Sequence, residues 1–315
     1  MLTSPAVSII IPHYNSVETV LTLLKSIPED PRFEVLVVDD RSSADISALR
    51  EALPGDQRRL LLNDRPNKGA GTARNIGLEQ AGGEWLLFAD ADDYFMDGWT
   101  EKVTPWLDSE VDEVFFSPTS FNLSTQTEGV RHRHYAELVN RHSRLQTERT
   151  EIELRYGFYT PWSKLIRRKV FTEHGIRFEE QMVANDVMAM TQCAYYSCAI
   201  QADPGVIYCV TCRNDTLTSK KNPKNFDIRI DTKIRRYHFL QQRLSRRHFR
   251  WTHADYYMTG SLVDSFLSKQ APGRVLKKYR ENGIPLLTLS TLNPAFLLRH
   301  AASDLSWRKE VSGRK

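Results

Sequence analysis

The chain has 315 residues, of which 41% are hydrophobic and 26% are charged, the composition of an ordinary globular protein and not of a disordered one. Its formal net charge of +4 is small, which argues against a nucleic-acid partner for the chain as a whole. No apolar run approaches the roughly 18 residues of a membrane span, and the run Ala6 to Ile11 lacks the features of a signal peptide. We therefore expect a cytoplasmic protein.

The first part of the chain alternates between short apolar runs and helical patterns. Helices are expected near residues 17–26, 45–53 and 72–80. The expected strands are Val7 to Ile11, Phe33 to Val38, Arg59 to Leu62 and Glu84 to Phe88. Short links between strand, helix and strand predict an α/β fold, with a mostly parallel central sheet flanked by helices on both faces.

Polar residues follow each of the four expected strands. They are Pro12-His13-Tyr14-Asn15, Asp39-Asp40-Arg41-Ser42, Asn67-Lys68-Gly69 and Asp90 to Asp93. Because the carboxyl ends of parallel strands lie on one edge of a sheet, we expect these side chains to share a cleft. Open α/β sheets bind their ligands at that edge, so the sequence predicts a ligand site there.

The acidic stretch is the strongest of these signals. Three carboxylates in four residues, Asp90, Asp92 and Asp93, directly follow the apolar run Trp85 to Phe88. Acids this close repel one another, and a divalent cation or a hydroxyl-rich ligand between them relieves the repulsion. A solvated acidic turn would have the same sequence, but the clustering with the other strand ends favours a ligand site.

A dinucleotide site is a weaker interpretation. The segment Gly69-Ala70-Gly71-Thr72-Ala73-Arg74 begins like the GxGxxG fingerprint, but Arg74 stands where the third glycine belongs. The segment also does not follow the first strand, as the nicotinamide-binding fold requires. An arginine at this position instead favours contact with a phosphate.

Four motifs in order resemble the signatures of family 2 glycosyltransferases of the GT-A fold. They are Val7 to Asn15, Glu34 to Ser42, Asn67 to Gly69 with Ala73 to Gly77, and Gly83 to Asp93. The segment Pro161 to Arg168 is similar to the family's W-x-K-L-x-R-R form, and Asn185-Asp186 lies where the family usually has Glu-Asp. The resemblance covers roughly residues 5 to 215. It implies a nucleotide-sugar-binding and catalytic domain over 1–215 and a helical C-terminal region over 216–315.

The resemblance implies transfer of a sugar from a nucleoside diphosphate, with UDP favoured, to a glycan or glycolipid acceptor, as in surface polysaccharide biosynthesis. Departure of the diphosphate requires neutralisation of its charge, for which Mn²⁺ or Mg²⁺ held by carboxylates is suited. One general base and no enzyme nucleophile would invert the anomeric centre.

By the resemblance, Asp92 is the direct metal ligand, and Asp90 binds the ribose hydroxyls or reaches the metal through water. Asp93 supports these two acids. Asp39 accepts a hydrogen bond from the uracil ring, although a turn or capping role is the alternative for an Asp-Asp-x-Ser segment. The remaining nucleotide contacts are the backbone from Pro12 to Tyr14, and Asn67, Ala91 and Arg74.

Asp186 is the expected general base, since the acceptor hydroxyl must lose a proton as it attacks. Its alternative role is to cap the following helix. Two positions depart from the family pattern: Asn185 replaces the usual glutamate, and Arg41 replaces the usual glycine. Lys164 could contact acceptor or phosphate, but we expect a surface lysine with a buried stem.

Two other functions compete with sugar transfer. A binding or scaffold protein could keep the fold without turnover, but Asp90, Asp92 and Asp186 are all present. A nucleotidyltransferase would need a loop rich in glycine and lysine after the first strand, which Pro12 to Val17 lacks.

The final third of the chain has helical spacing and an uneven charge. Eleven Lys or Arg residues and two acids lie between Lys220 and Arg250. Basic residues interleaved with aromatic ones, as in His248 to Trp251 and in the tail Trp307-Arg308-Lys309, can rest on an anionic bilayer. We therefore expect either peripheral association with the inner membrane surface, close to a lipid-linked acceptor, or a solvated basic face.

Overall fold

The computed structural model describes residues 4–66, 69–212, 223–267 and 271–286. The chain forms two compact units, Met1–Cys212 and Arg213–Lys315. The expected domain boundary at residue 215 lies outside the described residues, as do Asn67 and the tail from Trp307 to Lys315. Each unit has its own core and is described separately.

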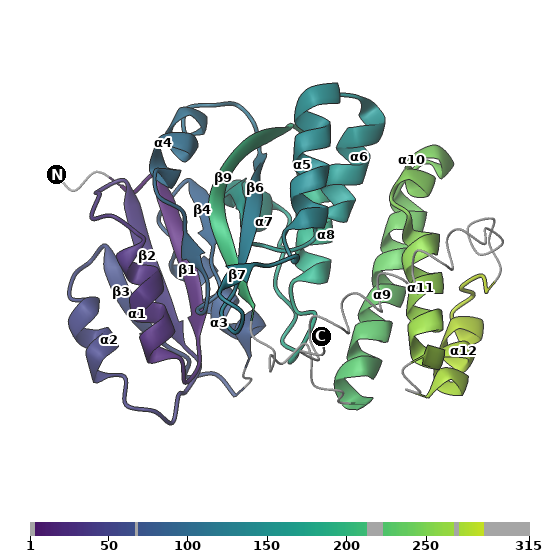
Figure 1. Ribbon diagram of the computed structural model, residues 1–315, viewed down its shortest axis with the longest axis horizontal. Coiled ribbons are helices and arrows are strands. Elements are labelled where there is room, and N and C mark those ends of the chain that lie inside the picture. The colour runs from purple at the N-terminus through teal and green to yellow at the C-terminus, as the bar shows by residue number, and fades with distance from the viewer. Residues whose placement is uncertain (1–3, 67–68, 213–222, 268–270, 287–315) are drawn as a thin grey trace. The chain divides into compact units, whose positions relative to one another are not determined.

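The first four strands of the first unit form the parallel part of a nine-stranded sheet (Figure 1). Their order is β3-β2-β1-β4, and Val7 at the start of β1 pairs with Phe33 of β2 and with Trp85 of β4. The strands are β1 (Val7–His13), β2 (Phe33–Asp39), β3 (Arg58–Leu62) and β4 (Trp85–Phe88). These are the four strands expected from the apolar runs.

Helices cover both faces of this sheet, because neighbouring residues of β1 point into different cores. Ile9 and Ile11 pack with one set of helices, and Ile10, between them, packs with another. The first set is α1 (Val17–Lys25), α2 (Ser47–Ala52), α4 (Trp99–Val103) and α5 (Arg133–Leu145). The second is α3 (Ala70–Gln80), α7 (Arg168–Glu173) and α8 (Val187–Tyr196). The predicted α/β architecture is confirmed.

The other half of the sheet is mixed. Next to β4 lies the antiparallel strand β8, and the order continues through β6 and β9 to β5. These strands are β5 (Tyr94–Phe95), β6 (Glu113–Asn122), β7 (Thr127–Glu128), β8 (Lys164–Arg167) and β9 (Ile200–Cys212). The short helix η1 (Thr104–Trp106) precedes β6, and α6 (Glu148–Gly157) precedes β8. The long strand β9 therefore returns to the acidic segment, since β5 directly follows Asp90 to Asp93.

Lys164 contradicts the expectation of a surface lysine. Its side chain in β8 is fully buried, and its Nζ lies 3.1 Å from Oε1 of Glu113, which is also fully buried on β6. The ammonium group lies 4.4 Å from the centre of the Phe115 ring. Burial lowers the pKa of Lys164, and the Glu113 carboxylate opposes that change. The motif lysine is therefore part of an ion pair in the core.

The second unit is helical, as expected. Its helices are α9 (Pro223–Arg243), α10 (Arg246–Trp251), α11 (Ala254–Leu267) and α12 (Pro272–Glu281). Its core contains Ile230 and Tyr237 of α9, Met258 of α11, and Val275 and Tyr279 of α12. None of the described helices is long and apolar enough to cross a lipid bilayer.

Candidate active site

The ends of β1 and β2 are joined by a small set of hydrogen bonds. Asn15 follows β1 in a left-handed conformation with φ of 51°, which asparagine tolerates better than most residues. Its Oδ1 accepts hydrogen bonds from the backbone of Ser43 at 2.8 Å and of Ala44 at 3.0 Å. Its own N–H donates to Ser42 Oγ at 2.8 Å. The polar residues after the two strands therefore lie side by side.

Asp39 presents an acceptor that no described group uses. The residue is buried, and its Oδ2 accepts a hydrogen bond from the Ser42 backbone at 3.2 Å. Its Oδ1 is buried without a hydrogen bond and lies 3.5 Å from Nε2 of His13. Burial lowers the pKa of His13, and Asp39 opposes this change. A buried acceptor without a hydrogen bond is costly, so Oδ1 is suited to a ligand N–H. Pro12 is buried beside it, and Tyr14 is exposed.

Arg41, which departs from the family pattern, lies in the turn after β2. Arg41 has φ of 59°, a left-handed conformation that glycine adopts without strain. Its guanidinium donates a hydrogen bond to the Pro66 carbonyl at 2.9 Å. Asp40, just before it, accepts from Asn63 Nδ2 and from the Gly69 backbone, both at 2.6 Å. Asp40 and Arg41 thus hold both sides of the segment that contains Asn67, which is outside the described residues.

The three acids after β4 have different environments, and strand β9 holds the carboxylate of Asp93. Tyr208 of β9 accepts a hydrogen bond from the Asp90 N–H at 2.8 Å and donates its own to Asp93 Oδ2 at 2.9 Å. Thr211 donates from its backbone to Asp93 Oδ1 and from its hydroxyl to the Asp92 carbonyl, both at 2.7 Å. Asp93 is buried and Asp92 is exposed.

The same three acids are close enough to interact electrostatically. Burial, and then the carboxylates of Asp92 and Asp90, raise the pKa of Asp93 well above its usual range. Asp93 therefore serves as the buried support of the loop, whereas Asp92 is exposed and Ala91 is partly exposed. The Asp90 side chain is 34% exposed.

Asp90 and Asp92 fit a divalent cation in chemistry and in number. Both are hard oxygen donors, and one or two carboxylates suffice where diphosphate oxygens and water complete the coordination of Mg²⁺ or Mn²⁺. The mutual repulsion that raises the pKa of Asp93 is also what a cation would relieve. Among the described residues no group of three or more His, Cys, Asp or Glu side chains could hold a metal by itself.

Arg74 connects the acidic loop to the segment that contains the predicted base. This buried residue of α3 donates from Nη2 to Asp90 Oδ1 at 2.6 Å and from Nη1 to Asn185 Oδ1 at 2.9 Å. Its guanidinium also lies 5.5 Å from the centre of the Phe178 ring. Because Asn185 is neutral, Asp90 is the only acid that Arg74 pairs with among the described residues.

The segment 178–186 is further fixed to α3 by Asn75 and Gly71. The Asn75 side chain donates to the Phe178 carbonyl and accepts from the Phe178 N–H, both at 2.9 Å. A Cβ atom on Gly71 would lie 2.1 Å from the Glu179 carbonyl oxygen, closer than any real contact. Glycine at this position therefore permits the backbone of the segment to lie directly on the helix.

Asp186 immediately precedes α8, but its side chain makes no capping hydrogen bond. Its carboxylate does interact with the backbone of Asp186 and of Val187, the first residue of the helix, so a role at the helix N-terminus stays the alternative. Burial raises the pKa of Asp186, Arg74 lowers it, and Asp90 raises it again, with a net increase. A buried carboxyl group with a raised pKa is a candidate for a general base.

Two residues near the site, Arg131 and Tyr135, had no motif to reveal them. Arg131 donates a hydrogen bond to the Thr211 carbonyl at 3.3 Å, next to the acidic loop. Although the side chain is exposed, partial loss of hydration lowers its pKa, and the nearby Asp93, Cys212, Asp90 and Asp92 raise it, with a net increase. Tyr135 of α5 lies near Tyr159, with ring centres 6.3 Å apart, and burial, Tyr159 and Asp186 raise its pKa well above the usual range.

Comparison with known proteins gives one family. Glycosyl transferase family 2 matches residues 8–175. An uncharacterised glycosyltransferase of Rickettsia conorii is 33% identical over 124 residues, 39% of this chain and 20% of its own length. The succinoglycan biosynthesis protein ExoO of Rhizobium meliloti is 40% identical over 91 residues, 28% of this chain and 26% of its own length. The chain thus aligns with about a quarter or less of these relatives.

Two solved structures share the fold. A crystal structure of Staphylococcus aureus TarS in complex with UDP-GlcNAc matches with a TM-score of 0.67 and 21% identity, over 97% of this chain and 90% of that one. The mannosyltransferase PcManGT of Pyrobaculum calidifontis, in complex with GDP-Man and Mn²⁺, matches with a TM-score of 0.55 and 18% identity, over 99% and 83%. The predicted GT-A architecture is confirmed by these likenesses.

Substitution of Gly71 tests the close contact between α3 and the segment 178–186. Gly71→Ala should lower the free energy of unfolding of the first unit by about 1–3 kcal/mol, because the methyl group meets a backbone carbonyl that has to move. Gly55→Ala is the control, since nothing lies within 4 Å of the added carbon. Urea denaturation of both variants is the measurement. Equal stabilities would show that the contact is not tight.

Proposed function

Since the chain belongs to glycosyl transferase family 2 and is a glycosyltransferase, we propose that it transfers a sugar from UDP to a hydroxyl group of a glycan or lipid-linked glycan. The proposed reaction inverts the anomeric carbon and depends on Mn²⁺ or Mg²⁺. One observation carries the proposal: Arg74 bonds to both Asp90 and Asn185, so the acidic loop and Asp186 belong to one site.

The donor nucleotide is assigned to the end of β1 and β2. The free Oδ1 of Asp39 would accept the hydrogen bond of the uracil ring N–H, and the backbone from Pro12 to Tyr14 would line the base. Asn67 and Ala91 complete the proposed nucleotide contacts. Asp90 would bind the ribose hydroxyls through the carboxylate that Arg74 orients.

Asp92 and Asp90 are the residues that would hold the cation. When bound, Mn²⁺ or Mg²⁺ supplies positive charge to the diphosphate as it leaves. Asp93 keeps the two ligand residues in position through its bonds to Tyr208 and Thr211. Arg131, beside the same loop, would add a second cationic contact for the diphosphate oxygens.

Asp186 is the proposed base. The acceptor hydroxyl oxygen attacks the anomeric carbon, its proton passes to the Asp186 carboxylate, and the bond from that carbon to the diphosphate oxygen breaks. No enzyme nucleophile takes part, so the attack comes from the face opposite the leaving group. Arg74 lowers the pKa of Asp186, whereas burial and Asp90 raise it.

The acceptor is proposed to be part of a surface polysaccharide, and the chain to work in the cytoplasm with peripheral contact to the inner membrane face. Support comes from ExoO, whose name assigns it to succinoglycan biosynthesis, and from the basic region of the second unit. No nucleic-acid partner is proposed, because the net charge of +4 is small.

Donor and metal binding can be tested together with a panel of sugar nucleotides in the presence of Mn²⁺. A UDP-sugar at 100 times its dissociation constant should stabilise the protein by about 2.7 kcal/mol in a thermal-shift measurement.

Asp92→Asn should reduce metal-dependent turnover by a factor of about 100 or more without unfolding the chain. Asp97→Asn, which changes an exposed acid of the same unit, should leave turnover intact. Full activity in EDTA would refute the metal site.

Asp186→Asn should reduce turnover by about 10²- to 10⁴-fold and leave donor affinity unchanged, because it removes only the proton acceptor. In the wild-type enzyme, turnover should fall at low pH as Asp186 becomes protonated. The midpoint of that fall should lie above the pKa of about 3.9 of an ordinary aspartate, because the pKa of Asp186 is raised. Stopped assays across pH and donor titration are the measurements. A parallel loss of donor affinity would assign Asp186 a structural role instead.

Arg131→Gln should weaken donor binding about 10- to 100-fold, the range expected when a charge-assisted hydrogen bond to phosphate is lost. Arg133→Gln, two residues further on and exposed at the start of α5, is the matched control. Isothermal titration with the donor and Mn²⁺ distinguishes the two. An unchanged affinity of the Arg131 variant would remove this residue from the proposed donor site.

A further inference from the structure

The second unit has a strongly basic end around α10. From Arg243 to Arg250 the sequence has no acid and four arginines: Arg243, Arg246, Arg247 and Arg250. Two of these cations lie over aromatic rings, with Arg243 4.1 Å from the ring centre of Phe239 and Arg247 4.5 Å from that of Trp251. Basic and aromatic side chains therefore occur together at this end.

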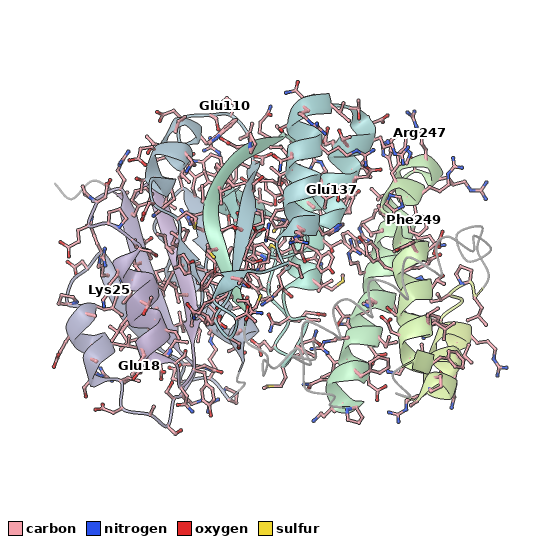
Figure 2. The ribbon with its side chains drawn as sticks, viewed as in Figure 1. Glu18, Lys25, Glu110, Glu137, Arg247 and Phe249 are labelled. Atoms are coloured by element: carbon pink, nitrogen blue, oxygen red, sulfur yellow. The ribbon has the colours of Figure 1, made fainter. Side chains whose placement is uncertain are left out.

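A cavity of about 600 Å³ opens here, lined by Gln241, Leu244, Arg246, Phe249 and Arg250. Figure 2 labels Arg247 and Phe249, which are two residues apart in α10. Arg246 and Arg250 are four residues apart on this helix, so their side chains lie on the same side of it. The cavity has the size of a site for a small organic ligand and combines two guanidinium groups with two apolar side chains.

The two arginines of the cavity have no acidic partner in the described part of the chain. Neither guanidinium forms a hydrogen bond or an ion pair there, whereas the acids of α9 are paired with cations of α12. Lys278 lies 2.6 Å from Asp231, and Arg274 pairs with Asp227. The positive charge in the cavity is thus available to an anion from outside the chain.

We propose that this cavity binds the phosphate group of an anionic phospholipid. Arg246 and Arg250 bind the phosphate oxygens. Leu244 and Phe249 contact the acyl chains of the lipid where they join the glycerol. A free phosphate would fill only the basic part of the cavity and would leave both apolar side chains in water. The ring of Phe249 also lies 5.2 Å from Tyr237, which fixes it at the rim of the helical core. The inference deepens the peripheral membrane contact proposed above and does not depend on sugar transfer.

Sedimentation of the full chain with lipid vesicles tests this site. One set of vesicles is phosphatidylcholine, and the other is phosphatidylcholine and phosphatidylglycerol in a three to one ratio. The wild-type chain should bind only the anionic set, and Arg246→Gln with Arg250→Gln should weaken that binding about 10- to 30-fold. Lys277→Gln with Arg280→Gln on α12 makes the same change in net charge and should weaken it by less than about threefold.

Four results would overturn the proposal. Equal losses in the two double variants would show that net charge alone attracts the chain, and binding to neutral vesicles would show that the phosphate charge is not recognised. Displacement by soluble glycerol phosphate would assign the cavity to a free phosphate. Undiminished binding of Leu244→Gln would exclude the apolar contact. Sugar transfer by the Arg246/Arg250 variant to a soluble acceptor, measured in parallel, distinguishes failure of the lipid site from failure of the proposed enzyme activity.

Discussion

The guanidinium of Arg74, bonded on one side to Asp90 and on the other to Asn185, holds the candidate site together. Asp90 balances the charge of this buried cation, and the bonds from Nη1 and Nη2 hold Asp90 and the segment 178–186 in one arrangement. The helix that carries Arg74 also binds the Phe178 backbone through Asn75 and permits the contact at Gly71. The position of Asp186 relative to the acidic loop follows from these contacts of one helix.

Three aspartates within four residues differ because strand β9 contacts them unequally. Tyr208 and Thr211 supply hydrogen bonds that hold Asp93 in the interior, while Asp92 is exposed and Asp90 is shared with Arg74. The Tyr208 hydroxyl is both an acceptor and a donor: it accepts a hydrogen bond from the Asp90 backbone and donates one to Asp93. The loop can therefore hold two further acids close together because the buried Asp93 supports it.

The sequence predicted the strands of the parallel sheet and the clustering at their ends, because the period of apolar residues and the turn residues are local signals. The effect of Arg41 on the turn could not be predicted from local signals. Arg41 has a left-handed conformation, and its guanidinium bonds to the Pro66 carbonyl in a different loop. The prediction that Lys164 lies at the surface was wrong for a similar reason. Its partner Glu113 is on another strand, and a charged residue in a short motif gives no sign of burial. Arg131 and Tyr135 lie in a region without motifs.

The buried pair of Lys164 and Glu113 also restricts how this chain can diverge. Both side chains are fully buried on adjacent strands, with Nζ and Oε1 3.1 Å apart. Loss of either residue alone leaves the other charge without compensation in the core, at a cost of about 3–5 kcal/mol, whereas replacement of both by apolar residues can be neutral. The two positions can therefore change together but not through either single intermediate, so descendants of this sequence should keep the pair or lose it whole.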